Sequence, residues 1–144
     1  MKRLLLGLVA GLLVGCGSLG TPSTGQLLGA PTSLNLGGRS VTAQAAPTVS
    51  GDVFRVHLKV QSGGVTGATL PPLTVTDLYV VTREGVWRSA VGSRLRSCGQ
   101  QCGLTTLSGP ARGLQRGEGV QVVVGLRDLQ GRPYLLRDGS VRVR

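Results

Sequence analysis

Three cysteines are the residues of this chain best suited to covalent chemistry. Cys16 lies near the start, whereas Cys98 and Cys102 lie in the second half and are separated by three residues. An odd number leaves one thiol free or paired outside the chain. A structural zinc site needs four Cys or His ligands, and His57 is the single histidine, so we expect no metal site. A redox pair stays open, although redox motifs usually have two intervening residues.

Residues for nucleophilic or acid–base catalysis are scattered or missing from the sequence. No G-x-S-x-G elbow occurs, although many serine hydrolases carry one. His57 lies between Arg55 and Lys59 on the polar side of a predicted strand, which indicates a solvated surface histidine. The six acidic residues are far apart, and several adjoin glycines, where acids commonly stabilise turns. Glycine motifs for phosphates or dinucleotides are also absent, so we expect no catalytic residues and no cofactor.

A run of arginines in the second half of the chain is the candidate binding feature. Residues 85–117 contain five arginines and no acid, in a chain of net charge +10. Arginine forks bind phosphate or carboxylate through paired hydrogen bonds, so four arginines are candidates for anion binding: Arg94, Arg96, Arg112 and Arg116. The alternative is a solvated arginine surface without a ligand. This window has only one aromatic residue, whereas single-strand binders interleave several with basic residues, so nucleic acid is not an expected partner.

The first sixteen residues have the layout of an export signal. Met1-Lys2-Arg3 is cationic, and residues 4–14 are uncharged and rich in leucine and valine. The tetrad Leu13-Val14-Gly15-Cys16 resembles the lipobox of bacterial lipoprotein precursors. The resemblance implies cleavage before Cys16 and attachment of fatty chains to its sulfur, which makes residues 1–15 a signal peptide and gives the chain a membrane anchor. The alternative is an ordinary signal peptide that happens to contain a cysteine.

With Cys16 assigned to lipid, two cysteines remain and can pair. Export brings them into an oxidising compartment, where Cys98 and Cys102 are expected to form a disulfide. The ring closed by this bond is short, so the chain-entropy model gives it only about 2 kcal/mol of stabilisation. The bond is therefore predicted to fix a loop rather than to hold the domain together.

Residues 16–39 are predicted to form a flexible linker from the lipidated cysteine to a folded domain over residues 40–144. The linker is dominated by small and polar residues with leucine, and Arg39 is its only charge. Such a composition is typical of flexible tethers. Leu34 and Leu36 alternate with polar neighbours, so a first strand within residues 33–47 stays open.

The rest of the chain has the alternation of antiparallel strands. The predicted segments are a strand over residues 54–61, a hairpin over 73–91, and a strand over 120–126 whose alternate apolar side chains point inward. A last strand is predicted over 134–143, with a turn or bulge at Asp138-Gly139. Short strands joined by Gly and Pro turns predict an all-β fold, a single antiparallel β-sandwich. Because the chain has only four aromatic residues, Trp87 is expected to be a core anchor rather than an exposed sugar platform.

This domain resembles bacterial immunoglobulin-like or fibronectin type III-like modules. The resemblance rests on the strand over residues 51–61, the hairpin over 73–90, and the run 117–124 followed by Asp128-Leu129-Gln130-Gly131. It implies an immunoglobulin-like sandwich, from which function does not follow, because this architecture serves many unrelated roles. Residues 94–117 depart from the family pattern, since they form a long, basic segment with the predicted disulfide.

Together these features predict a lipid-anchored envelope protein whose domain binds a partner or gives structural support and is not an enzyme. The expected location is the cell membrane or the outer membrane, with the domain facing the periplasm or the exterior. Besides the membrane, the expected partners are envelope proteins, or anionic envelope polymers and lipid head groups contacted by the arginine-rich segment. An envelope hydrolase that assembles its carboxylates only in space is the remaining alternative.

Overall fold

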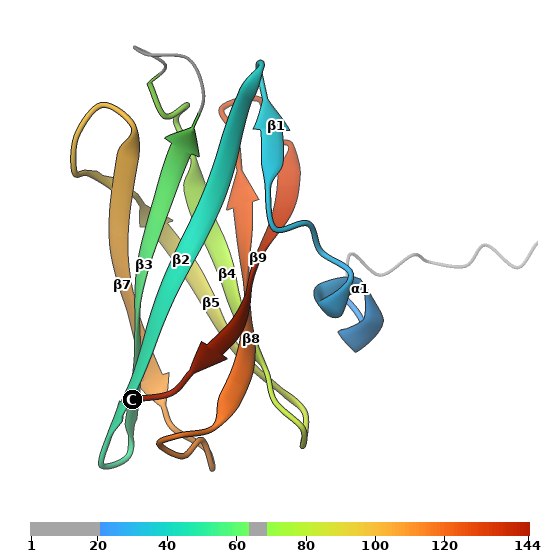
Figure 1. The fold of residues 1–144 in the computed structure, drawn as a ribbon, viewed down its shortest axis with the longest axis vertical. Helices are drawn as coiled ribbons and strands as arrows, with labels where there is room; N and C mark the ends of the chain where they lie inside the picture. Colours follow the sequence, from blue (N-terminus) through green and yellow to red (C-terminus); the bar gives the residue numbers. More distant parts are fainter. Residues whose placement is uncertain (1–20, 64–68) are drawn as a thin grey trace, which may run out of the picture.

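Two antiparallel β-sheets pack face to face in the computed structural model, which describes residues 21–63 and 69–144 (Figure 1). Sheet A has the strand order β1 (Leu34–Leu36), β2 (Arg39–Ser50), β3 (Val53–Gly63), β7 (Cys102–Pro110) and β6 (Arg96–Ser97). Sheet B has the order β5 (Val86–Arg94), β4 (Thr74–Val81), β8 (Gly119–Arg127) and β9 (Pro133–Arg142). The predicted signal peptide and Cys16 lie outside the described residues.

The strand order is that of an immunoglobulin-like sandwich. In sheet A, β2, β3, β7 and β6 follow the A, B, E, D order of such domains, and in sheet B, β5, β4, β8 and β9 follow the C′, C, F, G order. The chain crosses between the sheets after β3, β5 and β7. The expectation of an all-β, antiparallel, immunoglobulin-like sandwich is confirmed.

Trp87 lies in the core between the two sheets, as the sequence predicts. Its side chain on β5 is 8% exposed and packs edge-on against Phe54 of β3, with ring centroids 4.8 Å apart and ring planes at 68°. The indole N–H donates a hydrogen bond to the Pro110 carbonyl oxygen at 2.7 Å. Other large inward side chains that are fully buried are Leu58, Leu78, Leu126 and Leu136. Trp87 therefore joins strands of both sheets inside a core made largely of leucine and valine.

β9 passes through Asp138-Gly139 as a bulge instead of turning there. Its pairing with β8 shifts register between Val120 and Val122, so β9 carries an extra residue at this point. Asp138 Oδ2 accepts a hydrogen bond from the Ala45 amide of β2 at 2.8 Å. The bulge thus aims a carboxylate at an edge amide of the other sheet and satisfies it.

The end of the chain pairs with β2. The Arg144 amide donates to the Pro47 carbonyl oxygen at 3.0 Å, and the Val49 amide donates to the main-chain oxygen of Arg144 at 2.9 Å. In parallel strands, a residue makes its two main-chain hydrogen bonds to the residues just before and just after the one that lies opposite it. The C-terminus accordingly lies beside the end of β2 in Figure 1.

β7 lies within residues 94–117, where the sequence pattern identifies no strand. It pairs with β3 along nearly its whole length. Its inward row is Gly103, Thr105, Leu107 and Gly109, so it contains one large apolar residue. A Cβ atom at Gly109 would lie 2.9 Å from Trp87 Cζ2, so only glycine leaves room for the indole ring. Because tight packing between the sheets requires glycine at these inward positions, β7 lacks the alternation of large apolar and polar residues that would reveal a strand.

The described part of the predicted linker is folded, which corrects the expectation of a flexible tether up to residue 39. The short helix α1 (Thr24–Leu28) begins with a capping box: Ser23 Oγ accepts from the Gln26 amide, and Gln26 Oε1 accepts from the Ser23 amide. Leu27 is 0% exposed on the outer face of sheet B. Its cluster of buried neighbours comprises Ala30, Tyr79, Val81 and Val123.

Arg137 of β9 holds the segment that follows α1. Its amide donates to the Pro31 carbonyl oxygen at 2.8 Å, and its Nε donates to the Ala30 carbonyl oxygen at 3.0 Å. The folded unit therefore begins well before residue 40. No helix in the described ranges is long and apolar enough to cross a membrane.

Candidate functional site

Cys98, directly after β6, is paired with Cys102, the first residue of β7, and the two Cα atoms are 5.1 Å apart across the loop that joins these strands. The Cys98 amide also donates to the Cys102 carbonyl oxygen at 3.1 Å. Within this loop, the Gln100 carbonyl oxygen accepts from the Leu70 amide, and the Gln101 carbonyl oxygen accepts from the Ser62 amide, both at 2.9 Å. The predicted disulfide therefore fixes a loop whose backbone supports the end of β3 and the segment before β4.

The four candidate arginines lie in two pairs separated by the length of a strand. Arg94 ends β5 and Arg96 begins β6, beside the disulfide loop, whereas Arg112 and Arg116 lie in the connection from β7 to β8. β7 has nine residues and so spans about 30 Å between the two pairs. The structure therefore does not bring the four arginines into one site.

The pair after β7 lies in a region of mixed charge. Arg116 Nε donates to the Val49 carbonyl oxygen at 3.1 Å, which fixes the end of β2. Arg112 has φ 46°, in the left-handed region that residues other than glycine rarely adopt. It lines a depression of about 370 Å³ together with Trp87, Glu84 and Glu118. Arg88 also lines this depression, so two arginines face two carboxylates there, and the balanced charge makes it a poor selector for anions.

Arg96 lies instead on the outward face of sheet A, among other cationic and polar side chains. In register, Arg96 lies beside Leu104, and Leu104 lies beside Lys59 of β3. In the adjacent row, His57 Nδ1 lies 3.0 Å from Thr106 Oγ1. We call this surface the basic face and define it by Gln44, Ala46, Arg55, His57, Lys59, Arg96, Leu104 and Thr106. Apart from Arg55, these residues line one depression of about 600 Å³.

Of the residues on the basic face, the sequence predicts only Arg96 as a contact for a ligand. It places Arg55, His57 and Lys59 on the polar side of a strand and predicts no ligand for them. His57 is exposed, as the sequence predicts. The alternation along residues 54–61 already places the three β3 residues on one face. What the sequence does not reveal is that β7 and β6 bring Thr106 and Arg96 beside them.

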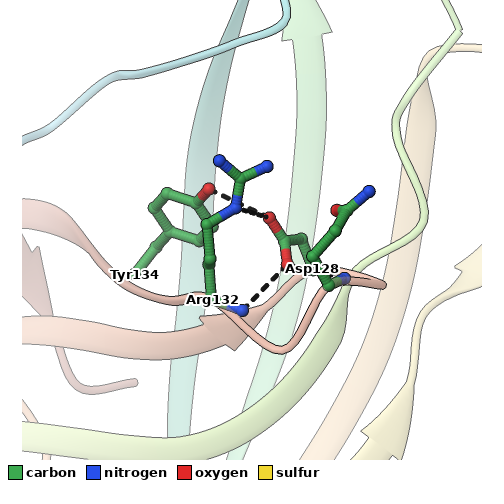
Figure 2. Close-up of polar contacts among 4 residues, drawn as sticks. Asp128, Arg132 and Tyr134 are labelled. Carbon is green, nitrogen blue, oxygen red and sulfur yellow. Dashed lines mark hydrogen bonds and ion pairs between the residues drawn. The ribbon is translucent and has the colours of Figure 1, made fainter.

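Asp128 organises the corner between β8 and β9 (Figure 2). Its Oδ1 accepts from the amides of Gln130 and Arg132, each at 2.9 Å. Its Oδ2 accepts from Arg132 Nε and from the Tyr134 hydroxyl, each at 3.0 Å. Gly131, with φ 79°, makes the tight turn possible. The Asp-x-x-Gly run of the sequence is thus a closed structural corner, with its carboxylate occupied.

These contacts make the stability of the corner depend on pH. Burial raises the pKa of Asp128, but the hydrogen bonds from Arg132 and Tyr134 and the charge of Arg132 outweigh it, so the pKa lies below its ordinary value. Ionised Asp128 therefore stabilises the fold above about pH 3.9, the unfolded value, and this contribution is lost as the pH falls through the folded pKa. We expect Asp128→Asn to be less stable than the natural chain at pH 7 and this difference to shrink toward pH 3.

Urea unfolding of both proteins at pH 7, 5 and 3, followed by circular dichroism, measures this difference. The reason for the expected loss at pH 7 is that an asparagine amide cannot accept hydrogen bonds at both of its ends. A difference that stays constant over the whole pH range contradicts the assignment of the effect to the ionised carboxylate.

Several other carboxylates have structural partners. Asp77 forms an ion pair with Arg88 at 3.0 Å, and Arg88 also donates to Thr21 Oγ1 at 2.8 Å. Asp138 accepts from the Ala45 amide, as described above, and Glu118 accepts from the Gln115 amide at 3.3 Å. Over residues 21–63 and 69–144, no cluster of three or more His, Cys, Asp or Glu side chains is placed to hold a metal ion.

Comparison with protein-family models, with curated proteins and with solved structures finds no match for this chain.

Proposed function

We propose that this chain is an exported lipoprotein, anchored to a membrane through Cys16, whose β-sandwich binds a partner in the cell envelope and does not catalyse a reaction. The observation that carries the proposal is the tetrad Leu13-Val14-Gly15-Cys16, which directly follows a cationic start and an apolar run. The pairing of Cys98 with Cys102 supports export, because disulfides persist in oxidising compartments.

The position of the first folded residues sets the distance between the anchor and the domain. Thr21 already contacts Arg88 on β5. Only four residues lie between Cys16 and Thr21, which makes five steps along the chain, and an extended chain spans at most about 3.6 Å per step. The Cα atom of Thr21 would therefore lie within about 18 Å of the Cα atom of the lipidated cysteine. The domain of such a lipoprotein would rest close to the membrane surface.

A binding role is supported by how the domain uses its acidic side chains. Asp128 closes a corner, Asp138 satisfies an edge amide, and Asp77 pairs with Arg88. Each of these carboxylates has a structural partner at 3.0 Å or less. Lys59 and Arg96 of the basic face, by contrast, line a depression on the outward side of sheet A.

Expression of the full chain in a bacterium that processes lipoproteins tests the anchor. We expect intact mass analysis of the membrane fraction to show a chain that begins at Cys16, carries a diacylglyceryl group and further acylation, and is lighter by two hydrogen atoms for the disulfide. Cys16→Ser is expected to abolish acylation and to leave the membrane fraction almost completely, because two or three acyl chains are what hold such a protein durably.

Cys98→Ser is the matched control, since it also removes one thiol but leaves the tetrad intact. It is expected to lose the disulfide and to keep the acyl groups. Recovery of the natural chain without acyl groups, or with residues 1–15 still attached, contradicts the proposal.

A further inference from the structure

Acidic and basic side chains are distributed unequally between the two sheets. The strands of sheet A contain no aspartate or glutamate, whereas β4 and β9 of sheet B contain Asp77 and Asp138. Three further acids lie in or beside the turns of sheet B, namely Glu84, Glu118 and Asp128, and the sixth, Asp52, lies in the turn between β2 and β3 of sheet A. Both ion pairs within the described ranges, Arg88–Asp77 and Arg132–Asp128, also belong to sheet B. The basic face therefore has no carboxylate among its strands to neutralise it.

The cations of the basic face form a line along β3. Arg55, His57 and Lys59 alternate on this strand, so neighbouring positions of the three lie about 7 Å apart and the two cations lie about 13 Å apart. Arg96 extends the row of Lys59 toward the edge of the sheet through Leu104. Arg55, Lys59 and Arg96 supply donors for acidic groups, and His57 adds a hydrogen-bonding ring. A linear ligand with repeated negative charges fits this arrangement better than a single small anion.

The other side chains of the face suit a polar chain-like ligand. Gln44 and Thr106 supply an amide and a hydroxyl, and Thr48 and Ser108 flank Arg55 in the next row. Ala46 and Leu104 contribute apolar surface to the lining of the depression. No aromatic residue points outward from the strands of sheet A, so the face has no ring on which a nucleic acid base can stack.

We propose that the basic face binds an anionic polysaccharide of the cell envelope, laid along β3 with its acidic groups on Arg55, Lys59 and Arg96. The choice of an envelope polymer rests on the proposed export of the chain, whereas the choice of an anionic ligand rests on the face itself. Hydroxyl and amide side chains bind the sugar hydroxyls, and the cations bind the acidic groups.

The membrane of the anchor is a less suitable ligand, because the chain enters the domain on the other side. α1 packs on the outer face of sheet B, and Thr21 is bonded to Arg88 there. Figure 1 shows α1 beside β9, away from β3 and β7. The basic face belongs to the opposite sheet and so turns away from the side that the short N-terminal connection holds near lipid.

Binding of the full-length protein, purified in a neutral detergent, to alginate as a polyuronate probe tests this inference. We expect binding that weakens steeply between 50 and 300 mM salt, about as screening of exposed charges requires, and no binding to neutral dextran. The double variant Arg55→Gln/Lys59→Gln is expected to bind roughly 25-fold more weakly, at about five-fold for each cation. The matched control Arg127→Gln/Arg142→Gln removes the same charge from exposed positions of sheet B and is expected to bind as the natural chain does.

Three results overturn the inference. Equal weakening in both double variants shows a general charge effect without a site on sheet A. A preference for phosphatidylglycerol over phosphatidylcholine vesicles that Arg55→Gln/Lys59→Gln loses, or a preference for single-stranded oligothymidylate over alginate, assigns the face to lipid or to nucleic acid instead. Absence of alginate binding removes the polysaccharide itself. None of these results alters the mass of the processed chain, so failure here is distinct from failure of the lipid anchor at Cys16.

Discussion

Replacement of Trp87 with alanine is expected to lower the free energy of unfolding by about 3–5 kcal/mol. The substitution removes the ring that fills the space between Phe54 and Gly109 and leaves a cavity lined by both sheets. It also leaves the Pro110 carbonyl oxygen without its indole donor. Domains of this size are commonly stable by only about 5–15 kcal/mol, so the variant is expected to be partly unfolded at moderate denaturant concentrations.

Trp87→Phe is the control that separates packing from hydrogen bonding at this position. It keeps most of the ring and removes the N–H, so a smaller loss of about 1–3 kcal/mol is expected. Because Trp87 is the single tryptophan of the chain, unfolding of both variants must be followed by circular dichroism rather than by tryptophan fluorescence. A loss below about 1 kcal/mol for the alanine variant means that Trp87 is not the anchor of the core.

Leu27→Ala is expected to lower the free energy of unfolding by about 2–5 kcal/mol, although it lies in a segment whose composition is that of a linker. Leu27 is 0% exposed and fills a pocket on sheet B that is lined by Tyr79, Val81 and Val123. If α1 unfolds together with the sandwich, the cost of emptying this pocket is measured in the main urea transition by circular dichroism.

The neighbouring leucine supplies a matched control. Leu28 is 44% exposed, so Leu28→Ala is expected to change the stability by no more than about 0.5 kcal/mol. Equal and small effects of the two substitutions contradict the docking of α1 and restore the flexible linker that the sequence predicts.

The sandwich could be predicted because most of its strands carry a clear period of two. β3 alternates from Phe54 to Gln61, and β8 has an inward row that begins at Val120. Trp87 could be placed in the core because so few other rings exist to fill it. In these elements the side chains that pack between the sheets are the same large apolar residues that make the alternation visible.

The elements that could not be predicted pack through small residues or through main-chain contacts. β7 turns Gly103 and Gly109 toward the core because Leu95 and Trp87 fill the space in front of them. α1 is only five residues long, too short for a helical period, and its one available signal was the Ser23-x-x-Gln26 capping box.

The grouping of the four candidate arginines could not be predicted from the sequence for a different reason. Arg94, Arg96, Arg112 and Arg116 are neighbours in sequence, but an unrecognised strand lies between the two pairs. Arg96 then shares a face with Lys59, which is far from it along the chain. Only the pairing of β3 with β7 brings these cations together, and strand pairing is a long-range property that composition does not encode.

The pairing of Arg144 with Pro47 and Val49 also bears on how the molecule would respond to mechanical load. Because Arg144 pairs with β2 in the parallel sense, a pull on β2 and on Arg144 in opposite directions along the strand would slide the two past each other. The hydrogen bonds between them would then be loaded in shear and would share the force, instead of opening one after another like a zipper. The two main-chain hydrogen bonds between Arg144 and β2 would therefore resist such a pull together.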